Sequence, residues 1–125
     1  MEEVETYYLD TYALHEIVVG NSNYKPYTEN LFVVTSKLNL MELYYVLLRD
    51  YGKKIAEEKY DSFLPYAINP EDHTIKTAMQ FKMQNKEKNL SYVDCIGYTI
   101  AREQGAVFLT GDKEFKDLIG VEYVK

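Results

Sequence analysis

The sequence is poor in cysteine, with Cys95 as its single example, and it contains no long hydrophobic run. One cysteine cannot form an intramolecular disulfide or a cysteine-rich zinc site, and this scarcity fits a reducing compartment. No stretch approaches the roughly 20 uninterrupted apolar residues of a membrane span. Residues 1–5 are acidic and lack the basic-then-apolar order of a signal peptide. We therefore expect a cytoplasmic protein that does not associate with membranes.

Positive charge is also scarce, because the chain has only two arginines and a formal net charge of −6 at pH 7. This balance excludes a protein that coats nucleic acid generally, since nonspecific affinity comes from lysine and arginine side chains that neutralise phosphates. It does not exclude a metal-dependent nuclease, because bound divalent cations reverse the charge at their own site. The length of 125 residues and the hydrophobic content of 46% predict one globular domain over residues 1–125.

No linker, repeat or low-complexity tract divides the chain, and strand-like and helix-like segments simply alternate. In the fourth predicted helix, we expect Asn69 as the N-cap and Pro70 as the first helical residue. Short apolar runs predict strands at residues 6–9, 31–35, 63–68, 106–109 and 121–124. Apolar periodicity and capping signals predict helices that begin near Asp10, Ser36, Lys53, Asn69, Ser91 and Lys113.

This alternation has a specific architectural consequence. Strands separated by helices of this length pair in parallel through right-handed crossovers. Strands that are apolar almost throughout indicate a sheet covered on both faces. The sequence therefore predicts the α/β class, as a three-layer α/β/α sandwich with about five parallel strands. In such folds the functional crevice lies outside the carboxyl ends of the strands.

Four acidic residues are expected near that edge of the sheet. Asp10 follows the first predicted strand and Asp112 follows the fourth, while Glu42 and Asp94 lie in the first turns of predicted helices. Each has a purely structural alternative. Either aspartate after a strand suits a helix N-cap. Capping boxes are compatible with the spacings Asn39–Glu42 and Ser91–Asp94.

As a set, the four acids favour a metal site. Glu42 stands in an apolar stretch, Leu40-Met41-Glu42-Leu43, where an ionised carboxylate is costly unless something compensates its charge. A shared cation would compensate all four carboxylates, and helix N-termini would help to keep them ionised. Carboxylate, hydroxyl and water oxygens form a hard ligand set, which suits Mg²⁺ or Mn²⁺ rather than zinc.

The acids stand in four short stretches that carry a family resemblance. The stretches are Tyr8-Leu9-Asp10-Thr11, Asn39-Leu40-Met41-Glu42-Leu43, Leu90-Ser91-Tyr92-Val93-Asp94-Cys95 and Phe108-Leu109-Thr110-Gly111-Asp112-Lys113-Glu114-Phe115. Together they resemble the PIN-domain family and, within it, the VapC-type toxins of toxin–antitoxin pairs. The resemblance runs nearly from end to end of the chain and is strongest in the last two stretches.

The resemblance implies roles for individual residues. Asp10, Glu42, Asp94 and Asp112 would be the catalytic, metal-binding acids. Thr110 would orient a water or an acid, and Thr11 would support the first acid. The same resemblance implies a ribonuclease that depends on Mg²⁺ or Mn²⁺ and cleaves RNA. It further implies a protein antitoxin as partner and a homodimeric assembly.

Other functions remain open at this stage. Within the nuclease class, the chain suits an RNA-processing enzyme outside any toxin pair. A phosphoacceptor receiver domain also has acids at strand ends, but it expects a pair after the first strand and one ending the third. A PIN fold that only binds is a further alternative. Tyr44, Tyr45 and Tyr51 are available for a protein interface. We favour structural or surface roles for the other polar residues considered, which are His15, His73, Lys53, Lys54, Lys82, Lys86 and Lys88.

Overall fold

The computed structural model describes residues 5–29 and 31–125, so most of the N-terminal segment considered above lies outside the described residues. Within those ranges, five strands form one parallel sheet in the order β3-β2-β1-β4-β5. The strands are β1 (Thr6–Leu9), β2 (Phe32–Ser36), β3 (Ala67–Ile68), β4 (Val107–Thr110) and β5 (Val121–Tyr123). The predicted parallel sheet is therefore confirmed.

Helices connect these strands, and most of their ends follow from local capping chemistry. The helix N-cap Ser36 accepts a hydrogen bond from the backbone N–H of Asn39 at 3.2 Å, as predicted for the helix that follows β2. The α-helices are α1 (Thr11–Val19), α2 (Lys37–Tyr51), α3 (Lys53–Phe63), α4 (Asp72–Gln84) and α5 (Tyr92–Gln104). Short 3₁₀ helices are η1 (Ser22–Thr28), η2 (Leu64–Tyr66) and η3 (Lys113–Phe115).

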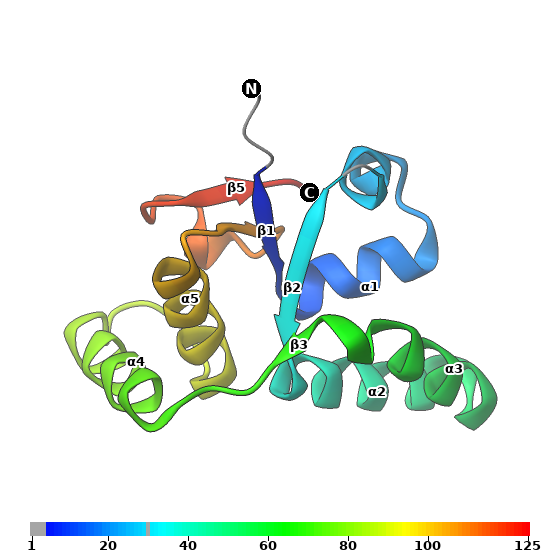
Figure 1. Cartoon of the computed structure of the whole chain (residues 1–125), viewed down its shortest axis with the longest axis horizontal. Coiled ribbons are helices and arrows are strands. Elements are labelled where there is room, and N and C mark those ends of the chain that lie inside the picture. Colours follow the sequence, from blue (N-terminus) through cyan, green and yellow to red (C-terminus); the bar gives the residue numbers. More distant parts are fainter. Residues whose placement is uncertain (1–4, 30) are drawn as a thin grey trace.

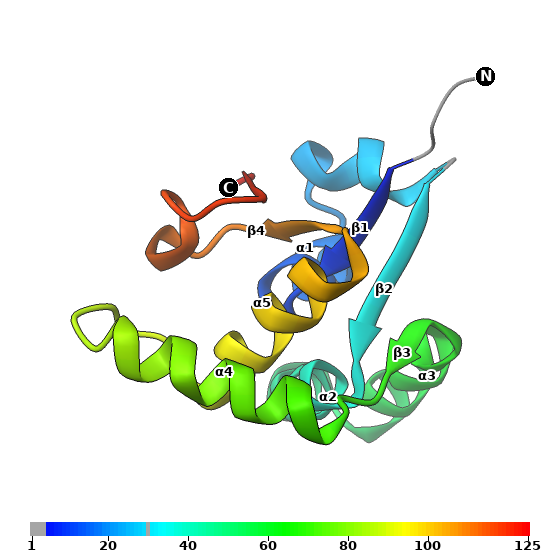
Figure 2. The ribbon, with the colours of Figure 1, turned by 60° about the vertical axis from the view of Figure 1, so that its left-hand side comes forward.

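The helices cover both faces of the sheet, as the three-layer prediction requires (Figure 1). Side chains alternate along β1, so Tyr7 and Leu9 pack with α1, α2 and α3, while Tyr8 packs with α4 and α5. Along β4, Leu109 joins the first group and Phe108 joins the second. In the rotated view, α4 lies beside α5, and the two helices cover the same face of the sheet (Figure 2).

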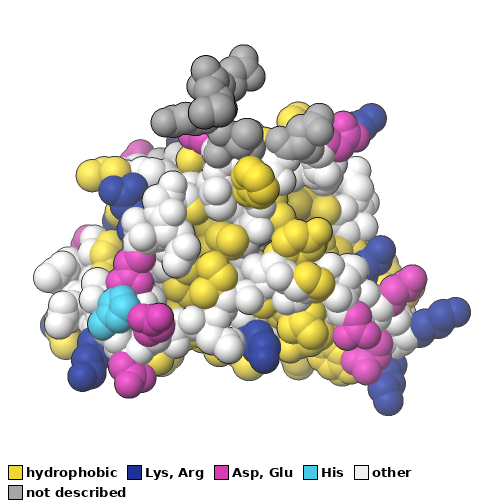
Figure 3. Space-filling view, in the orientation of Figure 1, with side chains coloured by type: hydrophobic (Ala, Val, Ile, Leu, Met, Phe, Trp, Pro, Cys, Tyr) yellow, Lys and Arg dark blue, Asp and Glu magenta, His cyan; other side chains and the backbone are white. Residues whose placement is uncertain are grey.

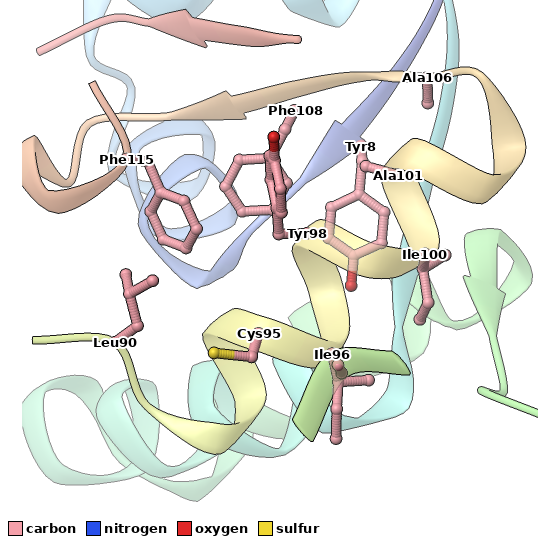
Figure 4. Packing of buried hydrophobic residues seen from close by; sticks show 11 residues of the cluster. Tyr8, Leu90, Cys95, Ile96, Tyr98, Ile100, Ala101, Ala106, Phe108 and Phe115 are labelled. Carbon is pink, nitrogen blue, oxygen red and sulfur yellow. The ribbon is translucent and has the colours of Figure 1, made fainter. Parts of the chain in front are cut away.

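An aromatic cluster ties together the elements that will carry the candidate site (Figure 4). The ring of Phe108 on β4 stacks on Tyr8 of β1 with centroids 5.6 Å apart, and it contacts Phe115 of η3 at 4.6 Å. Tyr98 of α5 meets the Phe108 ring edge-on at 5.6 Å. Buried aromatic pairs of this kind contribute about 0.5–1.5 kcal/mol each beyond their burial. The cluster therefore fixes β1, β4, α5 and η3 relative to one another.

The structure corrects the prediction for residues 63–68 and for the start of α4. Only Ala67 and Ile68 form a strand, because the chain first makes the 3₁₀ turn η2, in which Pro65 has no N–H to give to a sheet. Helix α4 begins at Asp72 with Glu71 as N-cap, so the expected capping role of Asn69 is wrong. The helix predicted at residues 113–118 is a single 3₁₀ turn.

The surface matches this layered arrangement. Hydrophobic side chains gather in the middle of the face seen in Figure 3, and charged side chains lie mostly towards its two ends, over α3 and α4. Across residues 5–29 and 31–125, no helix combines the length and the apolar character needed to cross a bilayer.

Candidate active site

The sheet reverses its direction of growth between β1 and β4. From β1 the chain builds outward through β2 to β3, then returns to place β4 and β5 on the other side of β1. Open α/β sheets bind ligands outside the carboxyl ends of strands at such a switch point. Asp10 follows β1 directly, Thr110 ends β4, and Leu9 pairs with Leu109 between them. The sequence-predicted acids of β1 and β4 therefore lie at the switch point.

A cavity of about 730 Å³ opens at this place. Asp10, Asp94 and Asp112 line it, so three of the four predicted acids face one space. Glu42 stands just behind the wall and is joined to it through Thr11, whose hydroxyl donates to Oε1 of Glu42 at 2.6 Å. The fold thus brings together residues from four separate parts of the chain.

Asp10 is the most enclosed of the acids, with 4% of its surface exposed. Its Oδ1 accepts the backbone N–H of Ala13 at 2.8 Å, and its Oδ2 accepts the Thr110 hydroxyl at 2.5 Å. Burial is the largest cause that raises the pKa of Asp10, and the charges of Asp94 and Asp112 add to the rise, while the two hydrogen bonds lower it; together they give a pKa of about 7. Metal-free, this carboxyl is therefore only partly ionised near neutral pH.

Glu42 lies in the second turn of α2 and is half-buried. Because Ser36 is the N-cap of α2, the capping-box alternative for Asn39 and Glu42 is wrong. Burial raises the pKa of Glu42, with a contribution from Asp94, while the Thr11 hydrogen bond opposes the shift. Thr11 therefore supports Glu42, and not the first acid as expected from the sequence.

Asp94 and Asp112 each combine exposure to the cavity with a capping role. Asp94 completes the predicted capping box of α5, accepting the Ser91 N–H at 2.9 Å while Ser91 Oγ accepts the Asp94 N–H at 3.0 Å. Burial raises the pKa of Asp94, the charge of Asp112 adds to the rise, and Ser91 and Lys82 oppose it. Asp112 caps η3 by accepting the Glu114 N–H at 3.0 Å.

The donor set suits a hard divalent cation. Each aspartate keeps one carboxylate oxygen that is not used in a helix cap. The carboxylates repel one another, and a bound cation would neutralise this excess of negative charge. Among the described residues, however, no three of these side chains already stand together as a closed ligand group. Binding of a divalent cation would therefore require rotation of the acidic side chains at the rim of the cavity.

The structure also shows participants that the sequence analysis missed. Asn39 is buried, accepts the Tyr8 hydroxyl at 2.5 Å and donates to Thr11 Oγ1 at 3.1 Å, so it holds the group that holds Glu42. From the sequence, Asn39 was considered only as a possible capping residue and as part of the stretch around Glu42. His15 also lines the cavity, as a residue with a surface role can, and its ring nitrogen lies 3.0 Å from Glu16.

Cationic side chains also reach this cavity. Arg49, Lys113 and Lys125 are among its lining residues, and they come from α2, η3 and the last residue of the sequence. A mixed rim of this kind places positive charge where a phosphate would approach the carboxylates.

Comparison with solved structures shows the same fold in several toxins. VapC20 of Mycobacterium tuberculosis, described as a toxin that cleaves the sarcin–ricin loop, superposes with a TM-score of 0.82 at 19% identity, over 95% of this chain and 99% of that one. VapBC2 of Rickettsia felis, bound to a promoter DNA fragment, gives 0.74 at 22% identity, over 96% and 99%. DNA-bound VapBC of Salmonella typhimurium gives 0.73 at 15% identity, over 97% and 98%.

Sequence comparison is consistent with the structural match. No curated protein sequence matches this chain significantly. The family profile described as PIN domain matches residues 7–120, which include all four candidate acids and Thr110. The chain therefore belongs to the PIN-domain family.

Proposed function

We propose that the chain is a divalent-metal-dependent endoribonuclease of the cytoplasm, acting as a single domain with Mg²⁺ or Mn²⁺. One observation carries the proposal: three carboxylates line one cavity at the switch point and Glu42 is linked to its wall through Thr11. Burial together with mutual repulsion raises the pKa of Asp10, Glu42 and Asp94. Such an arrangement is costly to a protein that leaves it empty, and strongly perturbed acids cluster at functional sites. Asp10, Glu42, Asp94 and Asp112 would hold the metal.

The chain's own residues would prepare the site for this chemistry. A bound divalent cation supplies hydroxide near neutral pH and stabilises charge on the phosphate oxygens. Thr110 would keep Asp10 oriented, with Oδ2 held at 2.5 Å. Thr11, itself held by Asn39, would do the same for Glu42. Lys113 and Lys125 at the cavity would draw the phosphodiester towards the carboxylates, whereas Arg49 is paired with Asp50 at 2.8 Å.

The toxin of a VapBC-type pair is the version of this function that we favour. Its support is the fold shared with VapC20 and with the two VapBC complexes. A protein antitoxin and a second copy of the chain would then be partners. Helix α2 offers an exposed apolar stripe for one of these partners. Met41, Tyr45 and Leu48 stand at positions i, i+4 and i+7 on one face of the helix, and they are 53%, 65% and 41% exposed. Tyr44 instead packs on Tyr60.

The alternatives remain distinguishable. An RNA-processing enzyme of the same fold would have the same site and no antitoxin. The receiver-domain alternative has little support, because β3 is followed by Asn69 and Pro70 and not by an acid. A PIN fold that only binds would retain RNA affinity without turnover.

Cleavage of RNA by the purified chain is the direct test. We expect cleavage with Mg²⁺ or Mn²⁺ and none with a chelator. The matched control is Asp94→Asn, which keeps an oxygen to accept the Ser91 N–H and removes only the charge. It should be folded and inactive. Cleavage that persists in the chelator, or in Asp94→Asn at the wild-type rate, would contradict the proposal, and so would the absence of cleavage on all cellular RNA.

A further inference from the structure

A second groove lies between α4 and the start of α5. We call it the α4–α5 groove; it has a volume of about 380 Å³ and is lined by Met79, Lys82, Met83, Lys86, Lys88 and Tyr92. From the sequence alone, its three lysines were expected to have surface roles. In the structure they surround one hollow together with an aromatic ring, which is a different arrangement from scattered surface charge.

The lining chemistry is specific. Half of the lining residues are lysines and none is a carboxylate, in a chain whose formal charge is −6. Glu87 belongs to the same turn but does not line the groove. Positive charge is thus gathered locally against the overall balance of the molecule, as it is in proteins that track a phosphate backbone.

The exposed side chains of the groove are unusual for a solvated face. Tyr92 is 66% exposed and Met83 is 64% exposed, so a ring and a thioether are offered to solvent. Lys82 Nζ lies 5.0 Å from the centroid of the Tyr92 ring and donates to the Leu90 carbonyl. These contacts hold the ammonium over one face of the ring, so a planar group would stack on the opposite face of the exposed Tyr92 side chain.

The groove adjoins the candidate active site. Tyr92 and Asp94 share the first turn of α5, which spans about 5.4 Å along the helix axis. Because the two residues are two positions apart, their side chains leave the helix on different sides, and a strand would pass around the first turn of α5 to contact both. A ligand longer than one phosphate is needed to span this distance.

We infer that the α4–α5 groove binds a single-stranded segment of the RNA substrate beside the scissile phosphate, with the lysines on phosphates and a base stacked on Tyr92. The inference rests on the proposed function for the identity of the substrate. Stacking on a protein ring requires an unpaired base, so the groove selects single-stranded or looped RNA over continuous duplex.

Binding of a short fluorescein-labelled oligouridylate, followed by fluorescence anisotropy in a chelator, tests the inference. The double variant Lys86→Ser/Lys88→Ser should bind at least tenfold more weakly, and the slope of log affinity against log salt should fall by about 1.4, or about 0.7 for each lost single-strand phosphate contact. Tyr92→Ala should weaken binding by about fivefold or more, whereas Tyr92→Phe should bind like wild type. Thermal melting of each variant verifies that it is folded.

The matched control is Lys53→Ser/Lys54→Ser, which removes the same charge from exposed positions on α3. It should change the affinity little. Equal losses in the two double variants, an unchanged Tyr92→Ala, or no binding of the probe by wild type would each overturn the inference. Cleavage by wild type is measured separately. Groove-dependent binding without cleavage would support the groove and contradict the nuclease, and cleavage without groove dependence would do the reverse.

Discussion

The hydroxyl of Thr110 donates to Oδ2 of Asp10 at 2.5 Å and accepts the backbone N–H of Asp112 at 3.0 Å. One side chain at the end of β4 therefore holds the acid that follows β1 and the turn that carries the last acid. This relationship makes Thr110 a positioning residue for the proposed site, in contact with two of its carboxylate-bearing segments.

Replacing Thr110 tests that role. Thr110→Val keeps the shape and removes the donor, so metal affinity and cleavage should fall by about 10–100-fold, as for other residues that orient metal ligands. Thr110→Ser should recover most of the loss because it keeps the hydroxyl. Isothermal titration with Mn²⁺ reports the affinity. If Val and Ser variants bind Mn²⁺ alike, the hydroxyl does not position Asp10.

Asp10 predicts an unusual pH dependence of stability in the metal-free protein. The pKa of its carboxyl is about 7 in the folded chain, against about 3.9 for an unfolded aspartate. Between these values the folded state binds more protons, so the free energy of unfolding falls as pH rises from about 4 to about 7. The contribution is fully present below about pH 4 and is lost above about pH 7. It amounts to a few kcal/mol, at about 1.4 kcal/mol per pKa unit.

Asp10→Asn should remove this slope. The measurement is urea denaturation in a chelator at a series of pH values, compared between wild type and variant. Saturating Mn²⁺ should also abolish the slope in wild type, because the metal holds the carboxylate ionised. Parallel pH profiles for the two proteins in the chelator would refute the assignment of the raised pKa to Asp10.

Asp94→Asn separates the capping role from the charge. In a chelator the variant should melt higher than wild type, since it relieves repulsion with Asp112 and keeps an acceptor for the Ser91 N–H. Mn²⁺ should raise the midpoint of wild type and should do so far less in the variant. Asp94→Ala provides the contrast, because it also loses the cap, which costs about 1 kcal/mol. A variant that melts below wild type throughout, with an unchanged Mn²⁺ shift, would mean that Asp94 is only a cap.

The wall of the cavity leaves no room for a side chain at Gly111, and this can be tested by substitution. A Cβ atom built there would lie 2.0 Å from Cε1 of Tyr12, a residue that lines the cavity. Gly111→Ala should therefore destabilise the fold by about 1–3 kcal/mol and displace the Tyr12 ring. In the double variant with Tyr12→Ala, the added methyl should cost much less than in the wild-type background. Equal costs in both backgrounds, from urea denaturation, would exclude the clash as the cause.

Much of the fold was predictable because its signals are local. Ser36 and Ser91 place side-chain oxygens next to free N–H groups, and both start helices as expected. Gly20 and Gly105 follow α1 and α5 in left-handed conformations with φ of 81° and 66°, which is the usual position of a glycine after a helix. The region around Pro65 was misassigned because apolar character alone does not distinguish a strand from an exposed 3₁₀ turn.

The site was only partly predictable. Because the carboxyl ends of parallel strands lie at one edge of a sheet, Asp10 and Asp112 were expected near each other. The switch point, however, depends on the strand order, which no local sequence pattern contains. The bonds that link Asn39 to Thr11 and Thr11 to Glu42 join residues about thirty positions apart, so neither Asn39 nor the true partner of Thr11 was recognisable from the sequence.

The pairing of β1 with β4 also determines when the proposed site can assemble during synthesis of the chain. Asp10 is made first, and its hydrogen-bond donor Thr110 is made 100 residues later. A ribosome-bound chain that lacks β4 therefore has an incomplete site, however well its first half is folded. The order of the residues along the chain therefore delays assembly of the proposed site until β4 has been synthesised.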